Sequence, residues 1–391
     1  MDFYFVWTPG SNEPRERYLW EIFPCTDGLL FSKGNIDPKL EEKIVKYGGI
    51  NRFLRWDGPI IGDSGAWLYK NEDEPPFSVK HLLDFYVRLR VPIGAHLDHS
   101  ILKSINVDGV RKELTLEEKK ERWRINIENA RETIELLSKE KFNGLEIIGV
   151  VQGWDIESYR ESAKELLEMG YEYLGIGGIA RRPTSQIKEI VEAINLEIDN
   201  LPLEKRKKIK IHLFGFGRLH LVPLFMEKRV VSFDTASPQR QAWESGEKNY
   251  HFANPWRSYT AIRIRLTKTR KSRRHLQKME EETLDTMYAY GRREVSMEEA
   301  LKKLLDYETK ILECDGVEDK KINKIITLLQ KRYLRTLKDR PWEKCNCPIC
   351  KEMCIDVIIF REGWRNGSRA YHNVRQFYLE LNQIRNRGGK D

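Results

Sequence analysis

The sequence lacks the features of a membrane or secreted protein. No stretch of its 391 residues approaches the roughly 18 uncharged apolar residues that a membrane-spanning helix needs. The segment Met1–Trp7 has neither the basic start nor the long apolar core of a secretory signal. Internal repeats and low-complexity linkers are also absent. We therefore expect a cytoplasmic, folded protein with no membrane partner.

Cysteine is scarce and unevenly placed. The chain has six cysteines, of which four fall between Cys345 and Cys354 while Cys25 and Cys314 stand alone. This spacing is not that of a disulfide framework. It indicates a metal site in a protein of a reducing compartment.

Short apolar, β-rich runs recur through the first 235 residues and alternate with segments of helical period. This alternation predicts a mostly parallel sheet, and eight such units favour a closed barrel over a doubly wound sheet. We therefore predict an α/β protein, with a (β/α)8 TIM barrel over residues 1–255 and a basic helical extension with a zinc-binding subdomain over residues 256–391. The runs are Phe3–Thr8, Asp27–Lys33, Pro59–Gly65, Ile93–His99, Leu145–Gly153, Tyr173–Gly178, Ile209–Gly217 and Val230–Ala236.

Three of the intervening helices have recognisable limits. Leu116–Lys139 is one long amphipathic helix by its period. Asp155 is a capping residue for a helix that ends near Met169, and Thr184 is a capping residue for a helix over Ile187–Ile198.

Nearly every predicted strand ends in polar or glycine residues. Catalytic groups of barrel enzymes lie at the carboxyl ends of the strands, so these residues converge on one mouth. Each could be a turn residue alone. As a set they indicate a function, because burying amides and acids is costly. They are Gly62-Asp63-Ser64-Gly65, Asp98-His99, Gln152-Gly153, Gly177-Gly178, Gly215-Phe216-Gly217 and Asp234.

Two of these acids are placed for paired chemistry. Asp63 and Asp234 follow strands that can present carboxylates across the mouth. One carboxylate can attack an anomeric carbon while the other handles a proton, as in retaining glycosidases. Paired acids can equally hold magnesium, and the residues alone do not separate the two readings.

The cysteine cluster predicts a structural zinc site. Cys345, Cys347 and Cys350 give three thiolates within six residues, and zinc requires a fourth ligand. That ligand is either Cys354 or His372. We favour His372, because a remote ligand ties the last helix to the loop and gives the metal a role in folding.

A basic segment follows the predicted barrel. Arg263–Lys278 holds eight Lys or Arg in sixteen positions and no acid, within a chain of net charge +8. A solvated surface is one reading, and contact with nucleic acid phosphates is the one we favour. The residues we assign to that contact are Arg270, Lys271, Arg273 and Arg274.

Taken in order, these motifs resemble the tRNA-guanine transglycosylase superfamily. The resemblance runs from about residue 27 to the C-terminus and is weakest over residues 256–340. The motifs are Gly62-Asp63-Ser64-Gly65-Ala66, Val151-Gln152-Gly153, Ile176-Gly177-Gly178-Ile179, Ser232-Phe233-Asp234-Thr235, Cys-x-Cys-x-x-Cys and His372-Asn373-Val374-Arg375.

The resemblance implies a role for each matching residue. Asp234 matches the nucleophile that forms a covalent nucleic acid intermediate, and Asp63 matches the acid/base aspartate. Asp98 matches the carboxylate that reads the guanine edge. The groups that hold the base near its O6 match Gln152, Gly177 and Gly178, and the zinc ligands match Cys345, Cys347, Cys350 and His372.

Departures from the tRNA enzymes point to one branch of the superfamily. Ala66 and Trp154 stand where those enzymes carry glycine, and Thr235–Arg240 replaces their run after the nucleophile. The chain is more similar to the DpdA branch, DNA-guanine transglycosylases that insert 7-deazaguanines into DNA. We therefore expect exchange of guanine in DNA for a preQ0-like base, with accessory modification proteins or a homodimer left open. The alternatives are the same exchange on tRNA, in the queuosine or archaeosine pathway, and an idle nucleic acid-binding barrel.

Overall fold

The chain forms two compact units. A computed structural model describes residues 1–10, 17–139, 142, 144–253, 256–266, 273–361 and 363–388. Residues Ser237–Gln383 group with the second unit. The sequence predicts a domain boundary at residue 255, and that boundary stays a prediction. The first unit comprises Met1–Pro9, Thr26–Ala236 and Ile384–Asp391, and the second comprises Gly10–Cys25 and Ser237–Gln383.

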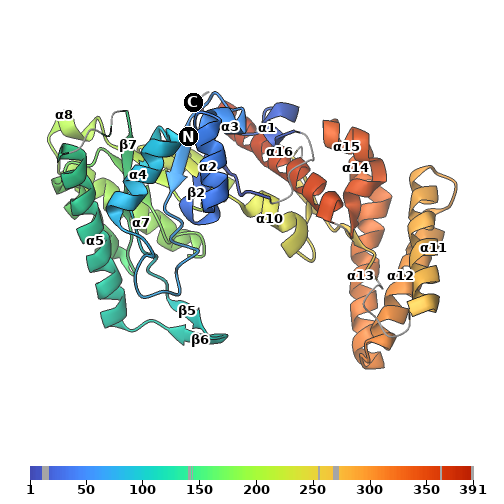
Figure 1. Cartoon of the computed structure of the whole chain (residues 1–391). Coiled ribbons are helices and arrows are strands. Elements are labelled where there is room, and N and C mark those ends of the chain that lie inside the picture. Colours follow the sequence, from blue (N-terminus) through green and yellow to red (C-terminus); the bar gives the residue numbers. More distant parts are fainter. Residues whose placement is uncertain are drawn as a thin grey trace. The chain divides into compact units, whose positions relative to one another are not determined.

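The first unit contains a closed barrel of parallel strands, in the order β1–β10–β9–β8–β7–β4–β3–β2 (Figure 1). Each of the eight strands overlaps one of the predicted runs, so the predicted (β/α)8 barrel is confirmed. The strands are β1 Asp2–Val6, β2 Gly28–Ser32, β3 Ile60–Asp63, β4 Ile93–Ala95, β7 Glu146–Val151, β8 Tyr173–Ile176, β9 Lys210–Leu213 and β10 Val230–Thr235.

Apolar and aromatic side chains fill the inside of this barrel. Tyr4, Leu30, Ile61, Ile148 and Tyr173, each from a different strand, pack into one buried cluster. A barrel of eight strands is just wide enough for such side chains. The interior is therefore a core, and a ligand can approach only at an end of the barrel.

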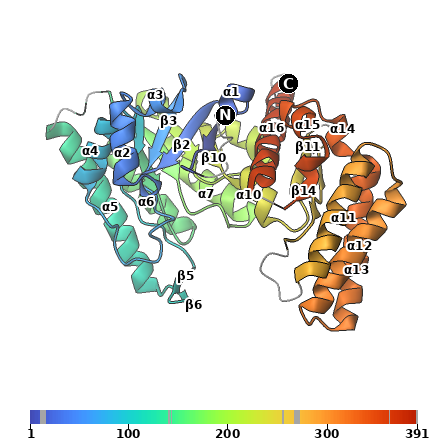
Figure 2. The same ribbon diagram turned by 45° about the vertical axis from the view of Figure 1, so that its right-hand side comes forward.

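Helices and one hairpin connect the strands. The antiparallel hairpin β5–β6 lies between β4 and α5, and in Figures 1 and 2 it projects beyond the start of α5. The connecting elements are η1 Lys33–Asn35, α2 Pro38–Lys46, α3 Ile50–Leu54, α4 Val79–Leu89, β5 Ser104–Val107, β6 Val110–Glu113, α5 Leu116–Lys139, α6 Ile156–Glu168, α7 Thr184–Asp199, α8 Leu203–Arg206, η2 Leu219–Leu221 and α9 Val222–Met226.

The predicted helix limits are largely those observed. The bounds of α5 are the predicted ones. Asp155 caps α6 through its side chain, which accepts a hydrogen bond from the backbone N–H of Ser158. The predicted cap at Thr184 is wrong, because α7 already begins at that residue and Pro183 precedes it. Proline at the cap fixes the entry angle without a side-chain hydrogen bond.

The second unit is mainly helical. Its helices α11, α12 and α13 lie side by side in Figures 1 and 2. No helix of the described residues combines the length and apolar character that a membrane crossing requires. The elements are α1 Leu19–Ile22, α10 Ser237–Glu244, β11 Tyr250–Ala253, β12 Trp256–Tyr259, β13 Ile262–Arg263, α11 Arg273–Gly291, α12 Met297–Cys314, α13 Asp319–Asp339, α14 Pro341–Lys344, α15 Pro348–Met353, η3 Cys354–Ile358, β14 Ile359–Phe360 and α16 Gly363–Gly388, whose last residues belong to the first unit.

Candidate active site and metal centre

The predicted functional residues of the barrel all lie at the carboxyl ends of its strands. Asp63 is the last residue of β3, and Asp234 is the penultimate residue of β10. Asp98 follows β4, Gln152 follows β7, and the Gly177-Gly178 pair follows β8. Because the barrel strands are parallel, these residues share one end of the barrel, which is where barrel enzymes carry their chemistry.

Asp234 is buried, and one of its two carboxylate oxygens is held in place. Its Oδ1 accepts a hydrogen bond from the backbone N–H of Gly215, at 3.0 Å, and lies 3.2 Å from Nε2 of His212. No partner for Oδ2 occurs among the described residues. The carboxylate is therefore oriented through one oxygen, which leaves the other for a ligand.

His212 contacts the predicted nucleophile, although no motif in the sequence points to it. His212 lies on β9 and is completely buried, and its Nδ1 lies 2.8 Å from Oγ of Ser232. The same Oγ lies 2.7 Å from the hydroxyl of Tyr173. The signal in the sequence was a lone histidine inside an apolar strand, where a core residue is the usual reading.

Asp98 lies in a buried hydrogen-bond network. Its Oδ1 accepts a hydrogen bond from Oγ of Ser64 at 2.7 Å, and its Oδ2 accepts one from Nε2 of Gln152 at 2.9 Å. The hydroxyl of Tyr69 donates to the backbone oxygen of Asp98 at 2.8 Å. Burial raises the pKa of Asp98, while the bonds from Gln152 and Ser64 oppose that rise. A carboxylate with two donors keeps further acceptor positions for a ligand.

Asp63 is half-buried and is held through Oδ2 alone. This oxygen accepts hydrogen bonds from Oγ of Ser32, at 2.9 Å, and from the backbone N–H of Gly65, at 3.1 Å. Burial raises the pKa of Asp63 to about 7, and repulsion from Asp98 and Asp234 adds to the rise. A carboxyl with a pKa near neutrality is suited to accept and return a proton.

The two glycines after β8 are required by Gln152. A Cβ on Gly177 would lie 2.4 Å from Nε2 of Gln152, and one on Gly178 would lie 2.9 Å from its Oε1. The backbone N–H of Gly177 donates to the carbonyl oxygen of Val151, so it is already used within the barrel. Among the described residues, the buried Oε1 of Gln152 has no hydrogen-bond partner. Buried acceptors without a partner are rare in proteins, and contact between this amide and a ligand stays a prediction.

The predicted metal ligands come together in the second unit. One ligand atom from each of Cys345, Cys347, Cys350 and His372 lies within 4.8 Å of the other three, and all four residues are buried. Nδ1 of His372 lies 3.3 to 3.7 Å from the three sulfur atoms. Three thiolates and an imidazole form a donor set that zinc prefers.

Surrounding groups fix how these ligands point. Nε2 of His372 donates to the backbone oxygen of His251 at 2.6 Å, which directs Nδ1 toward the sulfurs. Nε2 of Gln376 donates to the sulfur of Cys345, and the ring of Tyr250 stacks on His372 with 4.1 Å between centroids. The alternative ligand, Cys354, is exposed and lies outside the cluster.

The predicted phosphate contacts fall on a segment that the structure describes only in part. Arg270 and Lys271 lie outside the described residues, and Arg273 and Arg274 are the first residues of α11, with side chains outside the described atoms. Their assignment stays a prediction.

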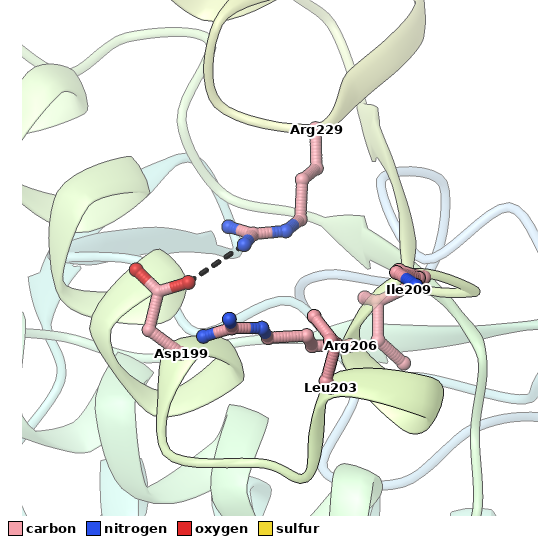
Figure 3. A pocket seen from close by; sticks show the side chains of 6 residues that line it. Asp199, Leu203, Arg206, Ile209 and Arg229 are labelled. Carbon is pink, nitrogen blue, oxygen red and sulfur yellow. Dashed lines mark hydrogen bonds and ion pairs between the residues drawn. The ribbon is translucent and has the colours of Figure 1, made fainter.

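A hollow of about 590 Å³ lies at the other end of the barrel (Figure 3). Ile209 and Arg229, which line it, directly precede β9 and β10. Figure 3 shows Arg206 and Arg229 extended toward Asp199, and Arg229 makes an ion pair with that aspartate. The ion pair between Arg229 and Asp199 lies at the amino ends of the strands, and residues at this end of a barrel usually serve stability. We do not assign it a function.

Comparisons with known proteins give matches over most of the chain. The family model described as queuine tRNA-ribosyltransferase matches residues 35–387. A DNA-guanine transglycosylase of Salmonella montevideo is 32% identical, over 96% of this chain and 91% of its own length. A queuine tRNA-ribosyltransferase of Rickettsia bellii is 26% identical over 58% of this chain and 62% of its own length. A tRNA-guanine(15) transglycosylase of Thermococcus onnurineus is 28% identical over 51% and 31%.

Proposed function

This chain belongs to the queuine tRNA-ribosyltransferase family and is a guanine transglycosylase, and from that membership we propose that it exchanges guanine in DNA for a preQ0-like 7-deazaguanine base. The observation that carries the choice of DNA is the extent of similarity. The relative named for DNA matches 96% of the chain, whereas the two relatives named for tRNA match 58% and 51%.

The proposed reaction begins at Asp234. Its free Oδ2 attacks C1′ of a deoxyguanosine that has left the base stack, and the C1′–N9 bond breaks. The electron pair of that bond goes to N9 of guanine, which takes a proton from the carboxyl group of Asp63. The sugar is then held as an ester of Asp234, with Oδ1 as the carbonyl oxygen that Gly215 and His212 contact.

The second half of the exchange reverses these steps with a different base. The 7-deazaguanine gives its ring N–H proton to the carboxylate of Asp63, and the nitrogen attacks C1′ as the ester bond to Asp234 breaks. Two inversions at C1′ give net retention, and Asp63 returns to its starting protonation state. Its pKa of about 7 allows both roles at neutral pH.

Recognition of the base falls to the network around Asp98. The two carboxylate oxygens of Asp98 can accept the parallel N1–H and 2-amino donors of a guanine edge. For the O6 side we assign the backbone N–H of Gly178 and the second hydrogen on Nε2 of Gln152, whose first hydrogen is donated to Asp98. Because the N–H of Gly177 is bonded to Val151, we assign Gly177 to the shape of the pocket and not to a hydrogen bond with the base.

We propose zinc as the metal and a structural role for it. The four buried donors Cys345, Cys347, Cys350 and His372 fit zinc and complete a tetrahedral shell without water. Bound zinc would supply folding free energy here, and no step of the exchange uses it. Thiols kept free for a metal are typical of a reducing compartment, so we place the enzyme in the cytoplasm.

For partners, we propose duplex DNA and a free 7-deazaguanine base. Arg270, Lys271, Arg273 and Arg274 remain our candidates for phosphate contact. The proposal leaves room for accessory modification proteins or a second copy of the chain. The second candidate function is the same exchange on tRNA, which the family description and the shorter matches favour. An idle barrel is disfavoured by the contacts of Asp63, Asp98 and Asp234, which leave ligand-accepting oxygens in place.

The test is incubation with a labelled 7-deazaguanine and either duplex DNA or tRNA, followed by digestion to nucleosides. We expect label in deoxynucleoside from DNA and none in nucleoside from tRNA. Label in tRNA alone would replace DNA with tRNA as the substrate, and label in neither would leave the chain without the proposed activity.

A further inference from the structure

Helix α13, Asp319–Asp339, carries a row of cations on one face. Between its terminal acids the helix contains seven Lys or Arg and no Asp or Glu. Five of these cations fall within about 60° of one another at 100° per residue, so they share one face. We call this face the α13 stripe, and it consists of Lys320, Lys324, Lys331, Arg335 and Lys338.

The α13 stripe is opposite the packed side of the helix. All five of its cations are exposed. Ile322, Tyr333 and Leu337 are buried, and they lie on the other face, which packs against α12. The stripe is therefore presented to solvent by a helix that the rest of its unit holds in place.

Ion pairing does not neutralise the stripe. Among the described residues, none of its four lysines lies within 4.0 Å of a carboxylate oxygen, and Arg335 contacts only the ring face of Tyr259, at 5.2 Å. On helix α5, by contrast, exposed cations form ion pairs with neighbouring glutamates. There Lys120 pairs with Glu117 and Arg124 pairs with both Glu121 and Glu128.

From this contrast we propose that the α13 stripe binds the phosphate backbone of duplex DNA. A rigid helix from Lys320 to Lys338 is about 27 Å long, which is most of one helical turn of B-DNA measured along the duplex axis. Proteins that hold single strands or RNA loops stack bases on exposed aromatic rings. The stripe has none, since Tyr333 is buried on the opposite face. A straight row of cations without stacking groups fits the regular backbone of a duplex.

The inference rests on the proposed function for its biological setting and can be tested apart from it. The variant Lys320→Gln/Lys324→Gln/Lys331→Gln/Lys338→Gln keeps the helix and removes four charges. The control, Lys120→Gln/Lys139→Gln/Lys164→Gln/Lys207→Gln, removes four lysines that each pair with a nearby glutamate.

Binding of a fluorescent duplex of random sequence is measured against salt concentration in the full chain. We expect the stripe variant to bind roughly 10-fold more weakly or worse and to lose about 3 units of the log–log salt slope, with little change in the control. Equal effects in the two variants, or wild-type binding by the stripe variant, would overturn the proposal. So would a loss confined to folded tRNA. If the wild type binds duplex through the stripe and exchanges no base, the stripe stands and the proposed function fails.

A separate set of contacts supports a second inference, which concerns the nucleophile and also rests on the proposed function. Tyr173, Ser232, His212 and Asp234 form one buried chain of hydrogen bonds, with successive distances of 2.7, 2.8 and 3.2 Å. Burial raises the pKa of Tyr173 to about 12, so its hydroxyl remains a donor. If each hydroxyl donates along the chain, Nδ1 of His212 accepts and its Nε2–H donates to Asp234.

We infer that His212 is a positioning residue that selects Oδ2 of Asp234 as the attacking atom. Its ring is held edge-on between Tyr4 and Phe214, with centroids 5.8 and 4.6 Å away. Both donors to Asp234, His212 and the N–H of Gly215, engage Oδ1. The carboxylate therefore cannot rotate without losing both hydrogen bonds, and Oδ2 stays directed to the mouth.

The test compares His212→Gln, which keeps an N–H donor, with His212→Leu, which removes it. We expect the leucine variant to form the covalent adduct about 10- to 100-fold more slowly, with unchanged affinity for free guanine, and the glutamine variant to recover most of the rate. Equal rates in both variants would overturn the inference. Should the leucine variant fail to fold, Ser232→Ala provides the second measurement, because it removes the hydroxyl that contacts Nδ1 of His212. A wild-type rate of adduct formation in that variant would count against the positioning role of His212.

Discussion

The barrel mouth and the metal centre are both built from buried polar groups, yet they differ in how far those groups are satisfied. At the metal centre the four donors face one another, and Gln376, Tyr250 and the oxygen of His251 cover their outer sides. At the mouth, Asp63 and Asp234 are each held by one oxygen, and Oε1 of Gln152 has no partner among the described residues.

This difference is the one we expect between a metal site that stabilises the fold and an active site that binds a ligand. A closed donor set stabilises the protein once its metal is bound. Polar groups that lack a hydrogen-bond partner until a ligand binds lower the stability of the free protein. Substitutions at the two regions should therefore fail in different measurements.

The largest expected effect is at Asp234. Asp234→Asn should lower base exchange by about 1,000-fold or more, since an amide cannot form the ester intermediate. The folded state and binding of DNA should stay close to wild type, because asparagine keeps an oxygen for the donors His212 and Gly215. Single-turnover kinetics measure the loss of exchange, and a thermal melt checks that the folded state is unchanged. If the melting temperature of Asp234→Asn falls together with its activity, the barrel mouth and the metal centre do not differ in the way we predict.

At the metal centre we expect the opposite pattern. Cys347→Ser removes one thiolate and should release the metal, with a loss of several kcal/mol in the free energy of unfolding. Elemental analysis should find about one zinc per wild-type chain and much less in the variant. Cys354→Ser is the matched control, since that exposed cysteine lies outside the cluster. A metal-free wild-type protein of undiminished stability would contradict the structural role.

Gly177 gives an effect of intermediate size on the mouth alone. A Cβ there would lie 2.4 Å from Nε2 of Gln152 and would push the amide off Asp98. We expect Gly177→Ala to weaken binding of the free base about 10-fold, the worth of one or two lost hydrogen bonds. Gly246→Ala is the control, because nothing lies within 4 Å of its added carbon. Calorimetric titration with guanine measures both, and equal affinities would exclude Gln152 from the base pocket.

The smallest predicted effect is on stability, at Asp63. Burial raises its pKa in the folded state from 3.8 to about 7, so between these pH values the folded chain holds a proton that the unfolded chain releases. The free energy of unfolding therefore falls as pH rises through this window. Asp63→Asn carries no such charge and should be more stable than wild type at pH 8, by about 1 kcal/mol after allowing for solvent screening. The difference should vanish near pH 4.

The same pKa shapes the rate of exchange. The first half of the reaction needs Asp63 as a carboxyl group and the second half needs it as a carboxylate, so exchange should be fastest near pH 7 and decline on either side. A rate that is flat between pH 5 and pH 8 would remove Asp63 from proton transfer.

How much of this was predictable from sequence differs between the two regions. The three cysteines lie within six residues, so local spacing alone pointed to a metal. The structure brings His372 and not Cys354 to these cysteines, while their role as ligands stays a prediction. The barrel was predictable because each strand is a short apolar run with a polar end, and all eight runs overlap observed strands.

What the sequence did not reveal depends on contacts between distant strands. His212 contacts Asp234 because β9 and β10 are neighbours in the barrel, and nothing in its local sequence separates it from a core histidine. The sequence likewise did not show why residue 177 is glycine, because Gln152, which fills the space beside it, comes from another strand end. The α13 stripe was not predicted from the sequence, because its cations are spread over a segment of mixed charge. They fall on one face only once the helix has formed.

One measurement tests the central claim, that Asp234 forms a covalent bond to DNA during base exchange. Wild type, Asp234→Asn and Asp63→Asn are incubated with labelled duplex DNA without an incoming base, denatured and separated by gel electrophoresis, and any adduct is digested and mapped by mass spectrometry. We predict a denaturant-resistant adduct on the peptide that carries Asp234 in the wild type, and none in Asp234→Asn. An adduct on another residue, or base exchange into DNA by Asp234→Asn at the wild-type rate, would contradict the account.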